Sequence, residues 1–295
     1  MTLDTSTLLI QVLGGLTRGT ILFIVASGLS LIFGVMRIID FAHGSLYMLG
    51  AFLAGLWGKQ LADQGNSFLA MVIVAPIVIG LVGVGIETML LRRIYKKEHL
   101  LQLLLTYGLT LILGDVVRMT MGSNQPRLVQ PAFLKGGIPI MDRRFPTYDF
   151  FLLIVGLVIA VALWLLLSRT RWGRIIRAAV SNPEILSALG VNVQWVFTGV
   201  FALGCWLAGL GGVLQASRAQ PALGMDSQII IEAFAVVVIG GLGSFAGALV
   251  GSLIIGVVLS VGILVVPQGA EALTFAVMAG VLIWRPWGLL GKQEA

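Results

Sequence analysis

Residues 233–257 read AFAVVVIGGLGSFAGALVGSLIIGV, an apolar run that glycines interrupt and no charged residue enters. Gly243, Gly247 and Gly251 recur at every fourth position. On a helix this spacing leaves one face without side chains, so another backbone can approach it closely. We therefore expect helix packing along this face. Residues 240–244 lie midway in a longer charge-free window, 233–270, which predicts a tight break between two helical segments.

The whole chain has the composition of a membrane protein. Its 295 residues are 58% hydrophobic and 11% charged, with a mean hydropathy of +1.01. Soluble domains carry roughly 25% charged residues, so a core in water could not bury this much apolar surface and lipid must cover part of it. The charges are also unevenly placed. None occurs in residues 19–36, 41–58, 64–86, 150–168, 185–217 or 233–270.

These windows predict the fold class. A helical crossing needs about 20 apolar residues, and the windows lack the alternating pattern of a transmembrane barrel. We expect an all-α polytopic membrane protein in which residues 1–295 form a single transmembrane domain. Apolar stretches at 100–114 and 272–284 bring the expectation to eight or nine transmembrane or partly spanning helices, with broken helices near the midplane.

Basic residues predict which side each loop faces. Two clusters of four lie in short loops that two expected spans separate, so both clusters face the same side, which the positive-inside rule makes the cytoplasm. The stretch 122–149 then faces the periplasm of a bacterial inner membrane, and the C-terminus, with Arg285 and Lys292, is cytoplasmic. Because the net charge of +6 sits between apolar spans, we expect contact with lipid and not with nucleic acid. The clusters are Arg92, Arg93, Lys96, Lys97 and Arg169, Arg171, Arg174, Arg177.

A second interruption occurs at residues 37–52, RIIDFAHGSLYMLGAF, where polar groups enter an otherwise apolar sweep. Charged groups near the membrane interior are costly and usually line a water-accessible cavity or a protein contact. Two interpretations stay open. Asp40, His43 and Gly44 begin a helix beside a solute pathway, or Asp40 only caps that helix at the interface, with Arg37 as its partner.

Residues 168–194, SRTRWGRIIRAAVSNPEILSALGVNVQ, form the one extended polar stretch expected on the cytoplasmic side. The sequence SNPE at 181–184 predicts a helix start, because proline and an acid favour the first turn. Residues 185–189 supply an apolar side, and Gly190 stops the helix. A short amphipathic helix at 183–190 either docks a partner protein or lies on lipid.

In this order and spacing, four phrases resemble the permease family of branched-chain amino-acid ABC importers, over nearly the whole chain. They are DFAHG (40–44), RWGRIIRA (171–178), the helix at 184–190 and IGGLGSFAGALVGSLIIG (239–256). Asp40 departs from the family pattern, which commonly has Asn there. The stretch 169–194 also resembles the EAA-type coupling loop of ABC importers, because Glu184 precedes Gly190 by six positions. Ile185 and Leu186 replace the two alanines of that pattern.

The resemblance implies a permease subunit that forms half of a pathway for branched-chain amino acids or a related small polar solute. Implied partners are a second homologous permease, two cytoplasmic ATPase subunits that hold ATP and magnesium, and a periplasmic solute-binding protein. The chain itself is expected to bind no cofactor or metal. Candidate pathway residues are Asp40, Phe41, His43, Gly44, Gly240, Gly241, Gly243 and Ser244, and the residues implied for ATPase coupling are Arg174, Glu184, Ala188 and Gly190.

Other functions fit the sequence less well. It contains no GxxxxGK[ST] phosphate loop and no HExxH metal site, so we expect a transport subunit and not an enzyme. The alternative is an ion-coupled or passive secondary transporter, which also uses broken helices; the helix at 183–190 favours the ATP-driven importer. The substrate stays open between leucine, isoleucine or valine and the urea, amides or aromatic acids of related systems, as does the choice between homo- and heterodimer.

Overall fold

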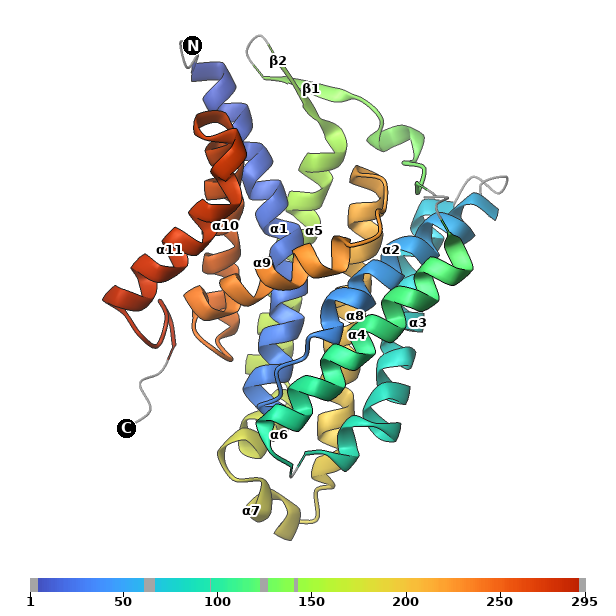
Figure 1. The fold of residues 1–295 in the computed structure, drawn as a ribbon, viewed down its shortest axis with the longest axis vertical. Helices are drawn as coiled ribbons and strands as arrows, with labels where there is room; N and C mark the ends of the chain where they lie inside the picture. The colour runs from blue at the N-terminus through green and yellow to red at the C-terminus, as the bar shows by residue number, and fades with distance from the viewer. Residues whose placement is uncertain (1–4, 61–66, 96, 123–126, 141–142, 292–295) are drawn as a thin grey trace.

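The computed structural model describes residues 5–60, 67–95, 97–122, 127–140 and 143–291. Figure 1 shows an almost entirely helical chain. One short hairpin, with Ile138 opposite Phe145, is the only sheet in these residues. The elements are α1 (Thr5–Met36), α2 (Ala42–Gln60), α3 (Ser67–Met89), η2 (Leu91–Arg93), α4 (His99–Met121), η3 (Ala132–Leu134), β1 (Gly137–Ile140), β2 (Arg143–Pro146), α5 (Thr147–Arg169), α6 (Arg171–Ser181), α7 (Pro183–Ala188), α8 (Val193–Arg218), α9 (Met225–Gly240), α10 (Phe245–Val265), η4 (Pro267–Gly269) and α11 (Ala270–Trp284).

Nine helices in the described residues are 15 residues or longer, namely α1 to α5 and α8 to α11. Six of them, α1, α3, α4, α5, α8 and α10, are long and apolar enough to cross a membrane. The other three, α2, α9 and α11, do not meet this measure. The predicted class, an all-α polytopic membrane protein with eight or nine transmembrane or partly spanning helices, is confirmed.

The centre of the bundle consists of α1 and α8. In the most apolar window of each, 78% and 72% of the residues are buried, against 17% in α5, whose outer face is left for lipid. Glycines let α1 and α10 approach closely. A Cβ atom added at Gly19 would lie 2.8 Å from the carbonyl oxygen of Ser252, so the backbones themselves are in contact.

The predicted break between α9 and α10 is present, and only one side of it is covered: Gly240 and Gly241 are buried, whereas Leu242 is 55% exposed and Gly243 is exposed. Gly241 has φ +103°, a backbone conformation that glycine adopts at little cost. The segment that follows α11 closes over this turn. Leu289 N–H donates to the carbonyl oxygen of Ile239 (2.8 Å), and Leu290 N–H donates to that of Gly240 (3.0 Å). The Gly240 side of the turn is therefore covered by protein from a distant part of the chain.

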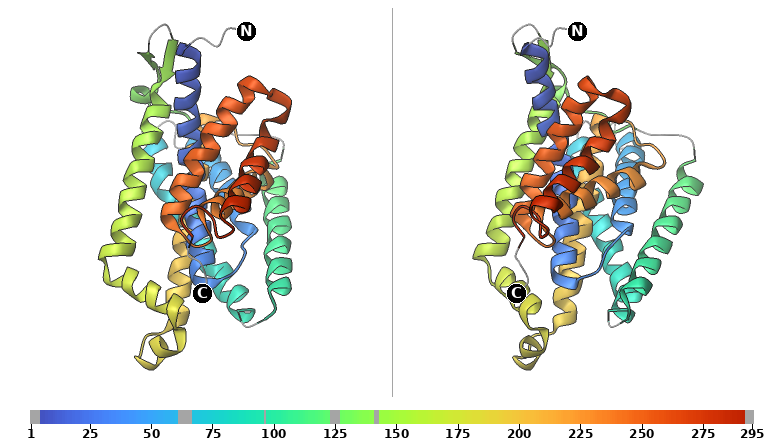
Figure 2. Two further views of the ribbon diagram at one scale, coloured as in Figure 1. Left: turned by 90° about the vertical axis from the view of Figure 1, so that its left-hand side faces the viewer. Right: turned by 60° about the vertical axis from the view of Figure 1, so that its left-hand side comes forward.

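The molecule has two different ends, visible in Figures 1 and 2. The first, the hairpin end, carries β1, β2 and the start of α5; the other, the α7 end, carries η2, α6 and α7. Arg174 and Lys135 lie at opposite ends, as predicted from the basic clusters. Lys96 and Lys292 fall outside the described residues, as do residues 123–126 and 141–142 of the stretch 122–149.

Candidate functional site

The break between α1 and α2 buries the Asp40 side chain completely. Its Oδ1 atom accepts a hydrogen bond from the Ala42 N–H, at the start of α2 (3.1 Å). Its Oδ2 atom lies 3.9 Å from His43 Nδ1 and has no hydrogen-bond partner among the described residues. The other ring nitrogen, His43 Nε2, lies 3.1 Å from the Val25 carbonyl oxygen in α1. Arg37 is exposed and forms no ion pair with Asp40, so the expected Arg37 partner is wrong.

The rest of the DFAHG segment packs against α9. The Phe41 ring lies 5.2 Å, between centroids, from the Phe234 ring. A Cβ atom added at Gly44 would clash with the carbonyl oxygen of Asp226, and Ser45 Oγ donates to the Asp226 carboxylate (3.3 Å). Within this chain these residues hold α2 against α1 and α9. Their place beside a solute pathway stays a prediction.

Glycines bring α9 and α10 into backbone contact. A Cβ atom added at Gly240 or at Gly247 would clash with the backbone of the other, and one added at Gly251 would lie 2.8 Å from the Val236 carbonyl oxygen. Real Cβ atoms essentially never come that close. Gly247 and Gly251 therefore share the helix face that the four-residue spacing indicated.

The turn itself contains the remaining glycine candidates. Gly243 precedes α10 instead of lying on it and meets Gly34 of α1, where an added Cβ would be 2.9 Å from the Gly34 Cα atom. Ser244 accepts a hydrogen bond from the Gly247 N–H (3.1 Å) and so caps α10. Gly241 packs on Gly291. Gly243 therefore does not share one helix face with Gly247 and Gly251. The pathway role of the turn stays a prediction.

The RWGRIIRA phrase forms a helix, α6, that the sequence reading did not predict. Thr170 Oγ1 accepts a hydrogen bond from the Gly173 N–H (3.1 Å) and starts it. Ile176 is buried, whereas Arg174 and Arg177 are exposed. The sequence signal that could have predicted α6 is a threonine cap followed by apolar residues at helical spacing.

The next helix, α7, agrees closely with its prediction. Asn182 Oδ1 accepts a hydrogen bond from the Ile185 N–H (3.0 Å), and Gly190, with φ +84°, follows the last turn. Only Leu186 is buried, with 6% of its surface exposed. Ile185 and Leu189 are 60% and 75% exposed, so most of the apolar side has no partner in this chain. The coupling candidates Arg174, Glu184, Ala188 and Gly190 are all exposed.

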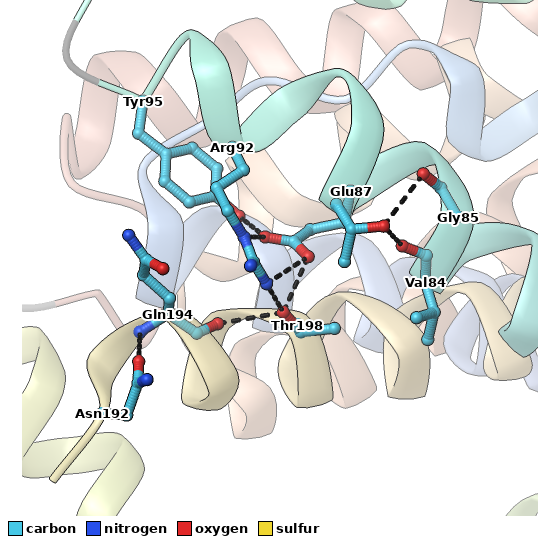
Figure 3. Close-up of polar contacts among 9 residues, drawn as sticks. Val84, Gly85, Glu87, Arg92, Tyr95, Asn192, Gln194 and Thr198 are labelled. Carbon is cyan, nitrogen blue, oxygen red and sulfur yellow. Dashed lines mark hydrogen bonds and ion pairs between the residues drawn. The ribbon is translucent and has the colours of Figure 1, made fainter.

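A buried carboxylate ties the α3–α4 connection to α8, as Figure 3 shows. Glu87, fully buried at the end of α3, accepts hydrogen bonds from Tyr95, from Thr198 (2.7 Å) and from Arg92 (3.3 and 3.4 Å). Burial and the hydrogen bond to Glu87 raise the pKa of Tyr95, which therefore remains a protonated donor. Both Glu87 oxygens accept hydrogen bonds, so the network holds the α3–α4 connection against α8 at the α7 end. The sequence analysis did not predict this network.

Two adjoining cavities open toward the hairpin end. One, of about 290 Å³, lies among α1, α2, α8 and α9; the other, of about 260 Å³, lies among α1, α5, α10 and β2. Both are lined by Arg18 and Arg218. Arg18 pairs with Glu232 (2.6 Å), and Arg218 pairs with Asp149 (3.1 Å). None of the predicted pathway residues lines either cavity, and sequence reasoning missed both ion pairs. The only hint was that Arg18 is the single charge in α1.

These features define a class. The chain is a multi-pass helical membrane protein with broken helices and with charged side chains buried beside cavities, which is the construction of a solute permease. It belongs to the family described as "Branched-chain amino acid transport system / permease component", whose family model matches residues 11–284.

Curated relatives agree with this family. The high-affinity branched-chain amino acid transport system permease protein BraD of Pseudomonas aeruginosa is 29% identical, and the corresponding LivH of Escherichia coli K12 is 28% identical; each alignment covers 96% of both chains. The ribose import permease protein RbsC of Haemophilus influenzae is 38% identical, over 35% of this chain and 34% of its own. No solved structure gave a significant match.

Proposed function

We propose that the chain is the permease subunit of an ATP-driven importer and forms half of a pathway for branched-chain amino acids or a related small polar solute. Its family and its multi-pass fold support this role. ATP and magnesium are bound by two ATPase subunits and not by this chain. A second homologous permease supplies the other half of the pathway, and a periplasmic solute-binding protein delivers the solute.

The proposed orientation places the α7 end in the cytoplasm of a bacterium and the hairpin end in the periplasm. The arginines of α6 and η2 lie at the α7 end, and basic residues in short loops favour the cytoplasmic side. Helix α11 runs away from the hairpin end in Figure 1, which is why we put the C-terminus in the cytoplasm as well.

The observation that carries the ATPase-driven function is the exposed apolar side of α7. This helix is capped at its start and held to the chain by Leu186, yet Ile185 and Leu189 remain largely exposed. Exposed apolar side chains on a fixed helix, rimmed by polar residues, are typical of protein contact sites. We propose that α7 inserts into a groove of an ATPase subunit, with Arg174 and Glu184 at its rim.

The test is Ala188→Arg. A long charged side chain would be desolvated and poorly paired in a packed contact, so ATPase association and ATP-dependent uptake should fall at least about tenfold. Because Ala188 is exposed in this chain, the permease should still fold. Co-purification of the ATPase with the permease measures the effect. Val129→Arg, an exposed apolar position at the hairpin end, is the control for that assay and should retain the ATPase.

Normal ATPase recovery and normal uptake by Ala188→Arg would contradict coupling through α7. Uptake that follows an imposed ion gradient in the absence of ATP would instead identify a secondary transporter. The two outcomes separate the proposal from its alternative.

A further inference from the structure

The larger cavity contains an ion pair whose hydrogen-bonding capacity is only partly used. A guanidinium group has five N–H donors, and Arg18 uses one nitrogen, Nη2, for Glu232 Oε1. That same Oε1 atom also accepts from Gln228 Nε2 (3.4 Å), whereas Glu232 Oε2 has no hydrogen-bond partner among the described residues. Tyr47 also lines the cavity, and its hydroxyl has no hydrogen-bond partner among the described residues. Hydrogen-bond donors of Arg18 and Tyr47 and an acceptor of Glu232 are therefore available at the same cavity.

Glu87 provides an internal contrast. Both of its oxygens are occupied by donors from this chain, and no cavity adjoins it among the two described. A charge inside a membrane-spanning bundle is costly, and such residues usually mark a substrate path. The Arg18–Glu232 pair has the same cost, but its unused hydrogen-bond donors and acceptor adjoin a cavity. A pair that only stabilised the fold would not need them.

The remaining wall of the cavity is mixed: Gln215, Arg218, Gln220 and Gln228 form its polar part, and an aliphatic part lies beside the ion pair. Ile21 and Leu22 of α1 and Ile229 of α9 line it beside the ion pair. Its volume of about 290 Å³ is close to the lower limit, about 300 Å³, of small-molecule sites. A ligand that fits has a compact aliphatic part and a polar end bearing both a negative and a positive charge.

We propose that this cavity binds a zwitterionic aliphatic amino acid on its way through the permease. The ligand carboxylate accepts hydrogen bonds from the free Arg18 N–H groups, its ammonium group donates to Glu232 Oε2, and Tyr47 donates its hydroxyl to the carboxylate. Because the pair and the zwitterion are each neutral, binding adds no net charge to the membrane interior. This site rests on the proposed function, since it names the residues that would recognise the transported solute.

The experiment is equilibrium binding of tritiated L-leucine to the full chain in lipid nanodiscs. N-acetyl-L-leucine lacks the ammonium group and L-leucinamide lacks the carboxylate. Each should compete about tenfold more weakly than L-leucine, or worse, because each loses charge-assisted hydrogen bonds. Equal competition by all three compounds would overturn the assignment of the charged groups.

Two variants test the residues. Glu232→Gln should weaken L-leucine binding about tenfold or more, while Glu98→Gln, an exposed glutamate at the α7 end, should leave it unchanged. Tyr47→Phe should weaken binding a few-fold and leave folding intact, because the hydroxyl makes no hydrogen bond to any residue that the structure describes. If Tyr47→Phe and Glu232→Gln bind L-leucine like the wild type, the site is wrong and the Arg18–Glu232 pair is structural only.

Failure here is distinguishable from failure of the proposed function. Absence of saturable L-leucine binding by the wild-type chain overturns the cavity site, while loss of ATPase association in Ala188→Arg would still support the importer. Conversely, the binding pattern expected here together with normal ATP-dependent uptake by Ala188→Arg would support the site and contradict coupling through α7.

Discussion

The α9–α10 turn and the α7 segment are both short interruptions marked by glycine and a polar cap, yet their surroundings are opposite. In the turn, Gly240 and Gly247 are in backbone contact, and the segment after α11 hydrogen-bonds to Ile239 and Gly240. In α7, Leu186 alone is buried. The difference teaches that similar local signals can serve either the interior of one chain or a contact with another, and that only the surrounding packing tells them apart.

The largest effect should come from Gly247→Leu. Overpacking of an ordinary core costs roughly 1–3 kcal/mol, and here the new side chain meets the Gly240 backbone, which cannot move aside. We expect loss of most folded protein. Cys205, the single cysteine, is fully buried, so its labelling by a maleimide dye reports unfolding.

The control for this substitution is Gly280→Leu, because a Cβ atom at Gly280 meets nothing within 4 Å. That variant should fold and protect Cys205 like the wild type. Equal yields for the two leucine variants would mean that the turn tolerates a side chain and that the proposed contrast with α7 does not hold.

A smaller effect should separate two leucines of α7. Leu186→Ala removes the one buried anchor and should destabilise the docking of α7 by about 2 kcal/mol. Leu189→Ala, at a position that is 75% exposed, should leave that docking unchanged and weaken only ATPase association. Hydrogen exchange of the amides at 184–190 measures the docking. Faster exchange in Leu189→Ala would show that α7 is held by more than Leu186.

The smallest effect concerns the third break, between α1 and α2. Asp40→Ala removes the oxygen that caps α2 and should lower the free energy of unfolding by about 1 kcal/mol. Asp40→Asn keeps a capping oxygen and should lose less and transport better than Asp40→Ala. The temperature at which Cys205 becomes accessible to the maleimide dye measures the stability of both variants. Equal losses would show that the charge of Asp40, and not its cap, is what matters.

Much of the fold could be predicted because its signals are local. The break at 240–244, the start of α7 at Asn182 and its end at Gly190 each depend on residues within one turn of helix. Helix α6 was not predicted although its signals are also local, a threonine cap and apolar residues at helical spacing, because three arginines alternate with those apolar residues.

The cavity could not be predicted in this way. Arg18 and Glu232 are 214 positions apart, and the local sequence around either residue does not indicate its partner. The same holds for Asp149 and Arg218, and for Gly34 against Gly243. Asp40 lies between these cases: its cap on Ala42 depends on local sequence, whereas its place beside a pathway stays a prediction.

The cover over the α9–α10 turn also sets an order of events during biosynthesis. The hydrogen bonds from Leu289 and Leu290 to Ile239 and Gly240 span about 50 residues, with α10 and α11 between them. They cannot form until those two leucines have left the ribosome and α11 has been inserted. Until then the carbonyl groups at the end of α9 lack these partners, in surroundings where an unpaired backbone group costs several kcal/mol. The α9–α10 turn is thus completed last, and a premature stop after α10 should yield a chain that the membrane quality-control proteases remove.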